Sequence, residues 1–141
     1  LKSVGQQLFH ALDGNLPTIT ARRAPSLTSS NKRWVRYVLG RMAISLNAFA
    51  YGTPGNPELI NGVGKAAPEI EHIIDRNFEY NGEGFDFDAQ MIATQRQRFG
   101  ALTILSRKEN REASNKAWET RLPIYEQSNI LSVTLAPPSY D

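Results

Sequence analysis

His72 is the side chain of this sequence best suited to acid–base chemistry. Glu69, Glu71 and Asp75 lie within one helical turn of it if the segment is a helix. A carboxylate beside an imidazole can orient the ring for proton transfer, as in many hydrolases. A nucleophile would have to be Ser or Thr, because the chain has no Cys, and no Gly-x-Ser-x-Gly elbow is present. A small hydrolase that uses His72 and these carboxylates is therefore kept as the second alternative function.

No metal or cofactor motif is complete. His10 and His72 lack the helical His-x-x-x-His spacing of a zinc site. The loop from Asn77 to Asp88 imitates an EF-hand, but Asn and Asp occupy its first and last positions, where the motif has Asp and Glu. Gly62-Val63-Gly64-Lys65 is too short to cradle a phosphate. The sequence predicts no catalytic site, no metal, no cofactor and no enzyme activity.

Basic residues near the first long helix form a different kind of candidate site. Arginine suits bidentate contact with phosphate, and Trp34 or Tyr37 could stack on a base. The same cations could instead contact an acidic protein or remain solvated on a helix flank. The residues expected to contact a polyanion or an acidic partner are Arg22, Arg23, Lys32, Arg33, Arg36 and Arg41.

The charges of the chain are sorted into blocks. Residues 1–50 carry seven Lys and Arg against one acid, and residues 51–90 carry eight acids against two basic residues. Such segregation acts on association more than on fold. Opposite patches can pair between copies and build rings or filaments, or they can face each other within one monomer. The expected acidic patch consists of Glu69, Glu71, Asp75 and Glu79.

The C-terminal tail contains a Pro-Pro-x-Tyr pattern formed by Pro137, Pro138 and Tyr140. A polyproline segment is already extended, so docking it into an aromatic groove such as that of a WW-type domain costs little entropy. A helical protein-interaction module that presents this tail is the first alternative function. The other interpretation of the tail is a plain extended terminus.

The composition fits one globular domain. A chain of 141 residues with 40% apolar and 21% charged residues can bury a substantial core. No apolar run reaches the length of a membrane span, so a cytoplasmic or virion location is favoured over a membrane. The expected organisation is a single helical domain over residues 1–141.

Apolar spacing and turn residues predict a mainly α fold with about four helices, long Gly/Pro loops and a short C-terminal β-like segment. The expected helices cover residues 2–12, 32–51, 69–78 and 89–122, with loops at 14–31 and 52–68 and an extended tail at 128–141. The expected core residues are Trp34, Val38, Met42, Leu46, Phe49, Phe99 and Leu102.

These patterns together favour a non-enzymatic structural or assembly protein that self-associates through segregated charge. It would form a homo-oligomer and could bind nucleic acid, by analogy with a viral capsid or nucleocapsid subunit.

Overall fold

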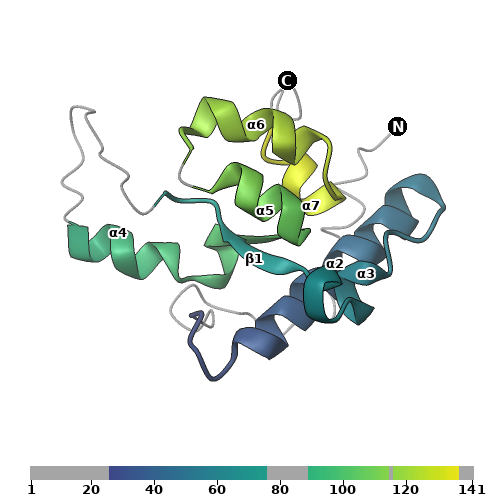
Figure 1. Ribbon diagram of the computed structural model, residues 1–141, viewed down its shortest axis with the longest axis horizontal. Helices are drawn as coiled ribbons and strands as arrows, with labels where there is room; N and C mark the ends of the chain where they lie inside the picture. Colours follow the sequence, from purple (N-terminus) through teal and green to yellow (C-terminus); the bar gives the residue numbers. More distant parts are fainter. Residues whose placement is uncertain (1–25, 76–88, 115, 137–141) are drawn as a thin grey trace, which may run out of the picture.

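The computed structural model describes residues 26–75, 89–114 and 116–136, and within them the fold is mainly α, as predicted. Figure 1 shows a strand crossing the middle of the molecule, with helices on both sides of it. The described elements are α2 (Lys32–Tyr51), α3 (Glu58–Asn61), η2 (Gly64–Ala66), β1 (Glu69–His72), α4 (Ala89–Arg96), η3 (Phe99–Ala101), β2 (Leu102–Leu105), α5 (Arg107–Ala113), α6 (Trp118–Glu126) and α7 (Ile130–Val133).

Helix α2 has the bounds that the sequence predicts. Its C-terminus is closed by Gly52, whose φ of 69° is left-handed and whose N–H donates to the carbonyl of Ala48. The C-terminal end is therefore set by a local residue, whereas Asn31 at the N-cap makes no side-chain capping hydrogen bond. The expected helix at 2–12 lies outside the described residues.

The predicted helix at 69–78 is wrong over its described part, because Glu69–His72 forms strand β1. This strand pairs antiparallel with β2, and Ile70 lies opposite Ile104. Both isoleucines are buried. The sheet thus joins residues thirty or more positions apart, a long-range pairing that local spacing does not reveal.

The predicted long helix at 89–122 is also wrong. It is divided into α4, η3, β2, α5 and the start of α6, and α6 continues through Pro123 to Glu126. All four residues of β2 are buried. A short apolar run that is buried on both faces has no helix-specific period, so helix and strand look alike in sequence.

Two smaller assignments also differ from the sequence analysis. The β-like run near the C-terminus is helix α7, whose N-cap Asn129 accepts a hydrogen bond from the backbone N–H of Leu131. The expected loop at 52–68 contains the short helices α3 and η2. The polar Asn129 cap favours a helix over a strand at this position.

The core faces a different side of α2 from the one predicted. Trp34, Met42 and Phe49 are 55%, 39% and 53% exposed, whereas Leu102 is buried as expected and Phe99 packs against the core. The main cluster consists of Val35, Leu39, Ala43, Leu59, Ile70, Leu102 and Ile104. A second cluster consists of Leu105, Ala113 and Tyr125. Val38 and Leu46 are half-buried.

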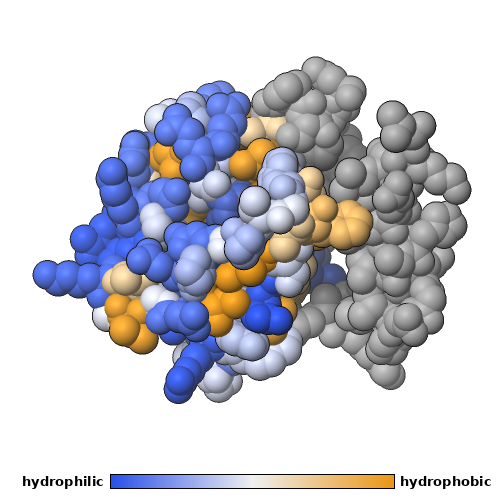
Figure 2. All heavy atoms as spheres, turned by 90° about the vertical axis from the view of Figure 1, so that its right-hand side faces the viewer, coloured by the Kyte–Doolittle hydropathy of each residue, from blue (hydrophilic) through white to orange (hydrophobic). Residues whose placement is uncertain are grey.

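Some hydrophobic side chains remain on the surface. In Figure 2, hydrophobic side chains form separate patches within a largely hydrophilic face. Among the described residues, no helix is long and apolar enough to cross a membrane.

Candidate functional site

His72 ends strand β1 and is half-buried. It lies opposite Leu102 in the sheet, and the backbone N–H of Ile73 extends the pairing by donating to Ala101 O at 3.0 Å. The ring Nε2 lies 3.3 Å from Gln97 Oε1. Because an amide oxygen only accepts, this contact is a hydrogen bond when Nε2 carries the hydrogen of the neutral ring. In that tautomer Nδ1 keeps its lone pair and can accept a proton.

The surroundings of His72 keep the imidazole neutral. Burial is the largest influence that lowers its pKa below the ordinary value of 6.5, and the charges of Arg96 and Lys32 lower it further. The hydrogen bond with Gln97 acts in the opposite direction. Arg96 is held in place by its Nε, which donates to Ile74 O at 2.9 Å. His72 is thus a neutral base in a cationic environment at neutral pH.

This lowered pKa predicts a loss of stability in acid. Below pH 6.5 the unfolded chain binds a proton at residue 72 that the folded chain does not bind, so the free energy of unfolding falls as the pH falls toward the folded pKa. His72→Gln should flatten the slope of that free energy against pH in this window, as measured by urea titration. His10 is common to both proteins and cancels in the comparison. Equal slopes would contradict the prediction.

Glu69 and Glu71, two of the three carboxylates near His72, do not serve it as the hydrolase alternative requires. Along a strand, successive side chains point to opposite faces, so Glu71 and His72 are separated. Glu69 binds Arg107 at 2.9 Å, and Glu71 binds Arg121 at 3.1 Å. In a helix these groups would have surrounded the imidazole, whereas the strand directs them to other partners.

Arg121 of α6 fixes the end of β1. It is 4% exposed, and its guanidinium donates to Glu71 Oε1 at 3.1 Å, to His72 O at 3.2 Å and to Ile73 O at 3.1 Å. The rings of Trp118 and Tyr125 lie 5.5 and 6.0 Å from its central carbon. This cation therefore holds the backbone that carries His72.

Tyr125 completes this network. Its hydroxyl donates to Glu71 Oε1 at 3.1 Å, and its ring meets Trp118 edge-on with centroids 5.8 Å apart. Burial, followed by the charge of Glu71, raises the pKa of the phenol well above its ordinary value. The sequence analysis missed the network, although Trp118, Arg121 and Tyr125 share one face of a helix by their i, i+3, i+7 spacing.

A second feature is a pocket of about 330 Å³, here named the basic pocket. It lies between the beginnings of α2 and α5 and the beginning of β1, and Glu69 and Arg107 face each other within it. The hydrogen bond from Arg107 has the largest effect on the pKa of Glu69 and lowers it. Burial acts in the opposite direction, and the hydrogen bond from Asn110 lowers the pKa further. The lining residues are Lys32, Arg36, Ala67, Pro68, Glu69, Ile70, Arg107 and Asn110.

The structure brings only part of the predicted basic cluster to this pocket. Lys32 and Arg36 line it because they are one turn apart on α2, whereas Arg33 and Arg41 are exposed and do not line it. Arg107, which the sequence analysis did not select, supplies the third cation. The positions of Arg22, Arg23, Glu79, Pro137, Pro138 and Tyr140 lie outside the described residues, and Asp75 is half-buried.

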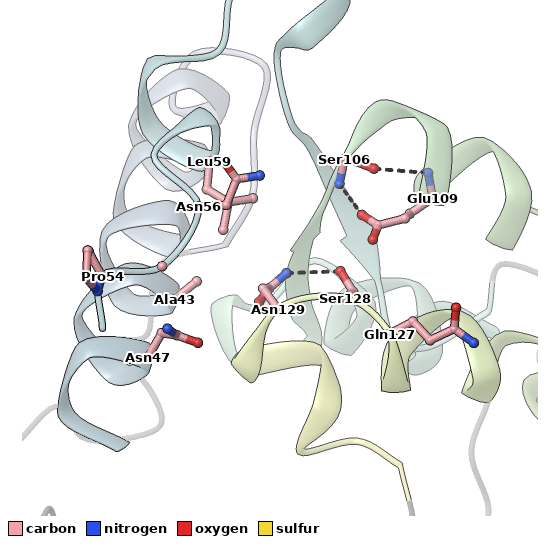
Figure 3. A pocket seen from close by; sticks show the side chains of 11 residues that line it. Ala43, Asn47, Pro54, Asn56, Leu59, Ser106, Glu109, Gln127, Ser128 and Asn129 are labelled. Atoms are coloured by element: carbon pink, nitrogen blue, oxygen red, sulfur yellow. Dashed lines mark hydrogen bonds between the residues drawn. The ribbon is translucent and has the colours of Figure 1, made fainter. Parts of the chain in front are cut away.

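A larger pocket of about 430 Å³ lies between α2 and the residues before α3 on one side and the start of α5 and the α6–α7 connection on the other, as Figure 3 shows. Several of its polar side chains are engaged with the protein. Asn47 donates to Thr53 O at 3.0 Å, Asn129 donates to Ile104 O at 2.5 Å, and Glu109 accepts from the backbone N–H of Ser106. These groups build caps and loops, so this pocket is structural rather than a site of free polar groups.

No three metal-ligating side chains converge anywhere in residues 26–75, 89–114 or 116–136. The EF-hand-like loop from Asn77 to Asp88 lies outside those ranges. The described residues thus provide two candidate features, which are His72 with its surroundings and the basic pocket. Lys32 lines the pocket, and its charge also acts on His72.

These features define a small mainly α domain whose two-stranded sheet presents a neutral histidine among cations. The family model described as "GmrSD restriction endonucleases, C-terminal domain" matches residues 20–135. Since the match covers most of the chain, the protein belongs to this family. Searches among curated proteins and among solved structures find no match.

Membership in a restriction-endonuclease family overturns the main functional prediction. The non-enzymatic, self-assembling structural protein is wrong, as are the viral capsid analogy and the expected lack of enzyme activity. The block pattern of charge was misleading because Glu69 and Glu71 pair with Arg107 and Arg121 of the same subunit. The homo-oligomer and the WW-type partner remain predictions.

Proposed function

We propose that this chain is the phosphodiester-cleaving part of a DNA endonuclease and that His72 accepts a proton from the attacking water. Two independent findings support this. The family is one of restriction endonucleases, which indicates DNA as the substrate. His72 has a lowered pKa, so its imidazole is neutral at pH 7, and the charges of Arg96 and Lys32 are close enough to contribute to that lowering. The observation that carries the proposal is this half-buried neutral base among cations.

The arrangement supports a hydrolytic step. Nδ1 of His72 takes one proton of a water molecule while the water oxygen bonds to phosphorus. The bond from phosphorus to the deoxyribose oxygen breaks, and the leaving oxygen takes a proton from solvent. Arg96 stabilises the negative charge that grows on the phosphoryl oxygens. Because the charges of Arg96 and Lys32 lower the pKa of His72, these two residues keep the base unprotonated before the reaction.

Replacing His72 with Ala tests the proposal. Removal of a general base reduces the rate by about 10²–10⁴-fold, so cleavage of supercoiled plasmid in Mg²⁺-containing buffer should fall by that factor. Lys108→Ala, an exposed cation that lines neither site, is the matched control and should cleave like the wild type.

Free imidazole should restore part of the activity of the His72→Ala protein, because it supplies the missing base in solution. Circular dichroism and thermal unfolding check that the variant is folded. Cleavage at the wild-type rate by the folded variant would exclude His72 as the base, and no cleavage by the wild-type chain would reject the proposed activity.

A further inference from the structure

We propose that the basic pocket binds a backbone phosphate of the DNA strand that is cleaved at His72, with Lys32, Arg36 and Arg107 as its contacts. The proposal rests on the proposed nuclease function and assigns a second substrate contact to it. The three cations come from two helices that are far apart in sequence and meet only in the folded chain.

The cations of the pocket have free hydrogen-bonding capacity. Within the described ranges, Lys32 and Arg36 form no ion pair, and Arg107 engages Glu69 through Nε alone. The terminal nitrogens of Arg107 thus remain for a ligand. One carboxylate against three cations leaves the pocket with a net positive charge, and Glu69 orients Arg107 rather than neutralising the site.

A phosphodiester fits this chemistry better than a neutral ligand. Guanidinium groups bind phosphate oxygens through two parallel N–H donors, and an ammonium adds a point charge. A pocket of about 330 Å³ accommodates such a group. The larger pocket offers no comparable cation, and the Asn47 amide and the Glu109 carboxylate in its lining are paired with the protein.

The pocket also lies at a useful distance from His72. Glu69 lines the pocket at the first residue of β1, and His72 is the last residue of this four-residue strand. A strand rises about 3.3 Å per residue, so these two positions are about 10 Å apart. Lys32 borders the pocket and is close enough for its charge to lower the pKa of His72. The side chains of Glu69 and His72 point to opposite faces of β1, so Lys32 is the residue that connects the pocket with His72. A DNA strand held at Lys32 can therefore place a neighbouring phosphate at His72.

Binding can be measured separately from cleavage. In a His72→Ala background, the affinity for a fluorescently labelled DNA duplex is followed by anisotropy at several salt concentrations. Adding Lys32→Ala and Arg36→Ala should weaken binding about tenfold and reduce the slope of log K against log salt by about 1–2, because phosphate contacts release counterions. Arg107→Ala should act in the same direction.

Matched controls lie on the same helix. Arg33→Ala and Arg41→Ala together remove two charges of α2 outside the pocket and should leave most of the affinity. An equal loss in the two double variants would overturn the proposal, since it would reflect net charge alone. Binding of inorganic phosphate to the wild-type pocket, combined with unchanged DNA affinity in the Lys32/Arg36 variant, would also overturn it.

These outcomes are separable from failure of the proposed function. Loss of DNA binding in the Lys32/Arg36 variant supports the pocket even if His72→Ala cleaves normally. Conversely, essential His72 with unaffected DNA binding would retain the nuclease and reject the pocket.

Discussion

Replacing Arg121 with Ala should lower the free energy of unfolding by about 3–5 kcal/mol, the range measured when one partner of a buried ion pair is removed. The Arg121 and Glu71 side chains are 5% and 12% exposed. Without the guanidinium, the Glu71 carboxylate loses the hydrogen bond from Arg121 and keeps the one from the Tyr125 hydroxyl. The carbonyls of His72 and Ile73 also lose the donor that Arg121 provides. Each of these groups then stays buried after losing a hydrogen bond that offset the cost of its desolvation.

Urea unfolding of the wild type, Arg121→Ala and Arg33→Ala gives the comparison. Arg33 is exposed and forms no ion pair with the described residues, so its removal should change the free energy by less than about 0.5 kcal/mol. A loss below about 1 kcal/mol in Arg121→Ala would show that the pair contributes no more than an exposed one.

A double-mutant cycle with Glu71→Gln refines the result. Glutamine keeps an oxygen that can accept from Arg121 and Tyr125 but removes the charge. A coupling free energy between residues 71 and 121 that differs clearly from zero would attribute the stabilisation to their contact. Additive losses would instead assign it to the two carbonyls of β1 and to the Trp118 ring.

The sequence identified elements whose signals are local. The sequence predicts helix α2 from its continuous apolar spacing and from Gly52 at its end, and the structure has a helix with these bounds. Strand β1 could not be found in this way because its partner β2 follows more than thirty residues later. In isolation, Glu69 and Glu71 fit the first turn of a helix electrostatically. The pairing of Ile70 with Ile104 overrides that local preference.

The candidate site shows the same difference between what local residues indicate and what long-range packing decides. Residue type alone was enough to select His72, Lys32 and Arg36 as chemically useful. Their grouping depends on the sheet and on the docking of α5, which no spacing along the chain encodes. The sequence analysis selected neither Arg107 nor Arg121. Tertiary packing buries Arg121 and brings Arg107 to the basic pocket.

The predicted orientation of α2 was also wrong, because the face that packs against the core includes the small residues Gly40 and Ala43. Apolar side chains cover a wide arc of this helix, and the largest ones were taken as the core. The helix instead docks through Val35, Leu39 and Ala43, with Gly40 at the closest approach to α3. A narrow contact lined by small residues gives a weaker hydrophobic signal than an exposed Trp34.

Replacing Gly40 with Ala should therefore be strongly destabilising despite the high helix propensity of Ala. A Cβ at this position would lie 2.2 Å from Leu59 O and 2.9 Å from Leu59 C, both backbone atoms that cannot rotate away. Helix α3 would have to move off α2, and Leu59 with it would withdraw from the core. Overpacking of this kind costs about 1–3 kcal/mol and occasionally more, against a propensity gain of about 1 kcal/mol.

Gly100→Ala is the matched control, since its added Cβ would meet nothing within 4 Å and its φ is not left-handed. It should be neutral or stabilise slightly by restricting the unfolded chain, by at most about 1 kcal/mol. Opposite signs for the two glycines in urea unfolding would show that contact with α3 decides the outcome. Equal values would mean that α3 yields freely, and α2 would then be positioned by β2 and α7, its other neighbours in the fold.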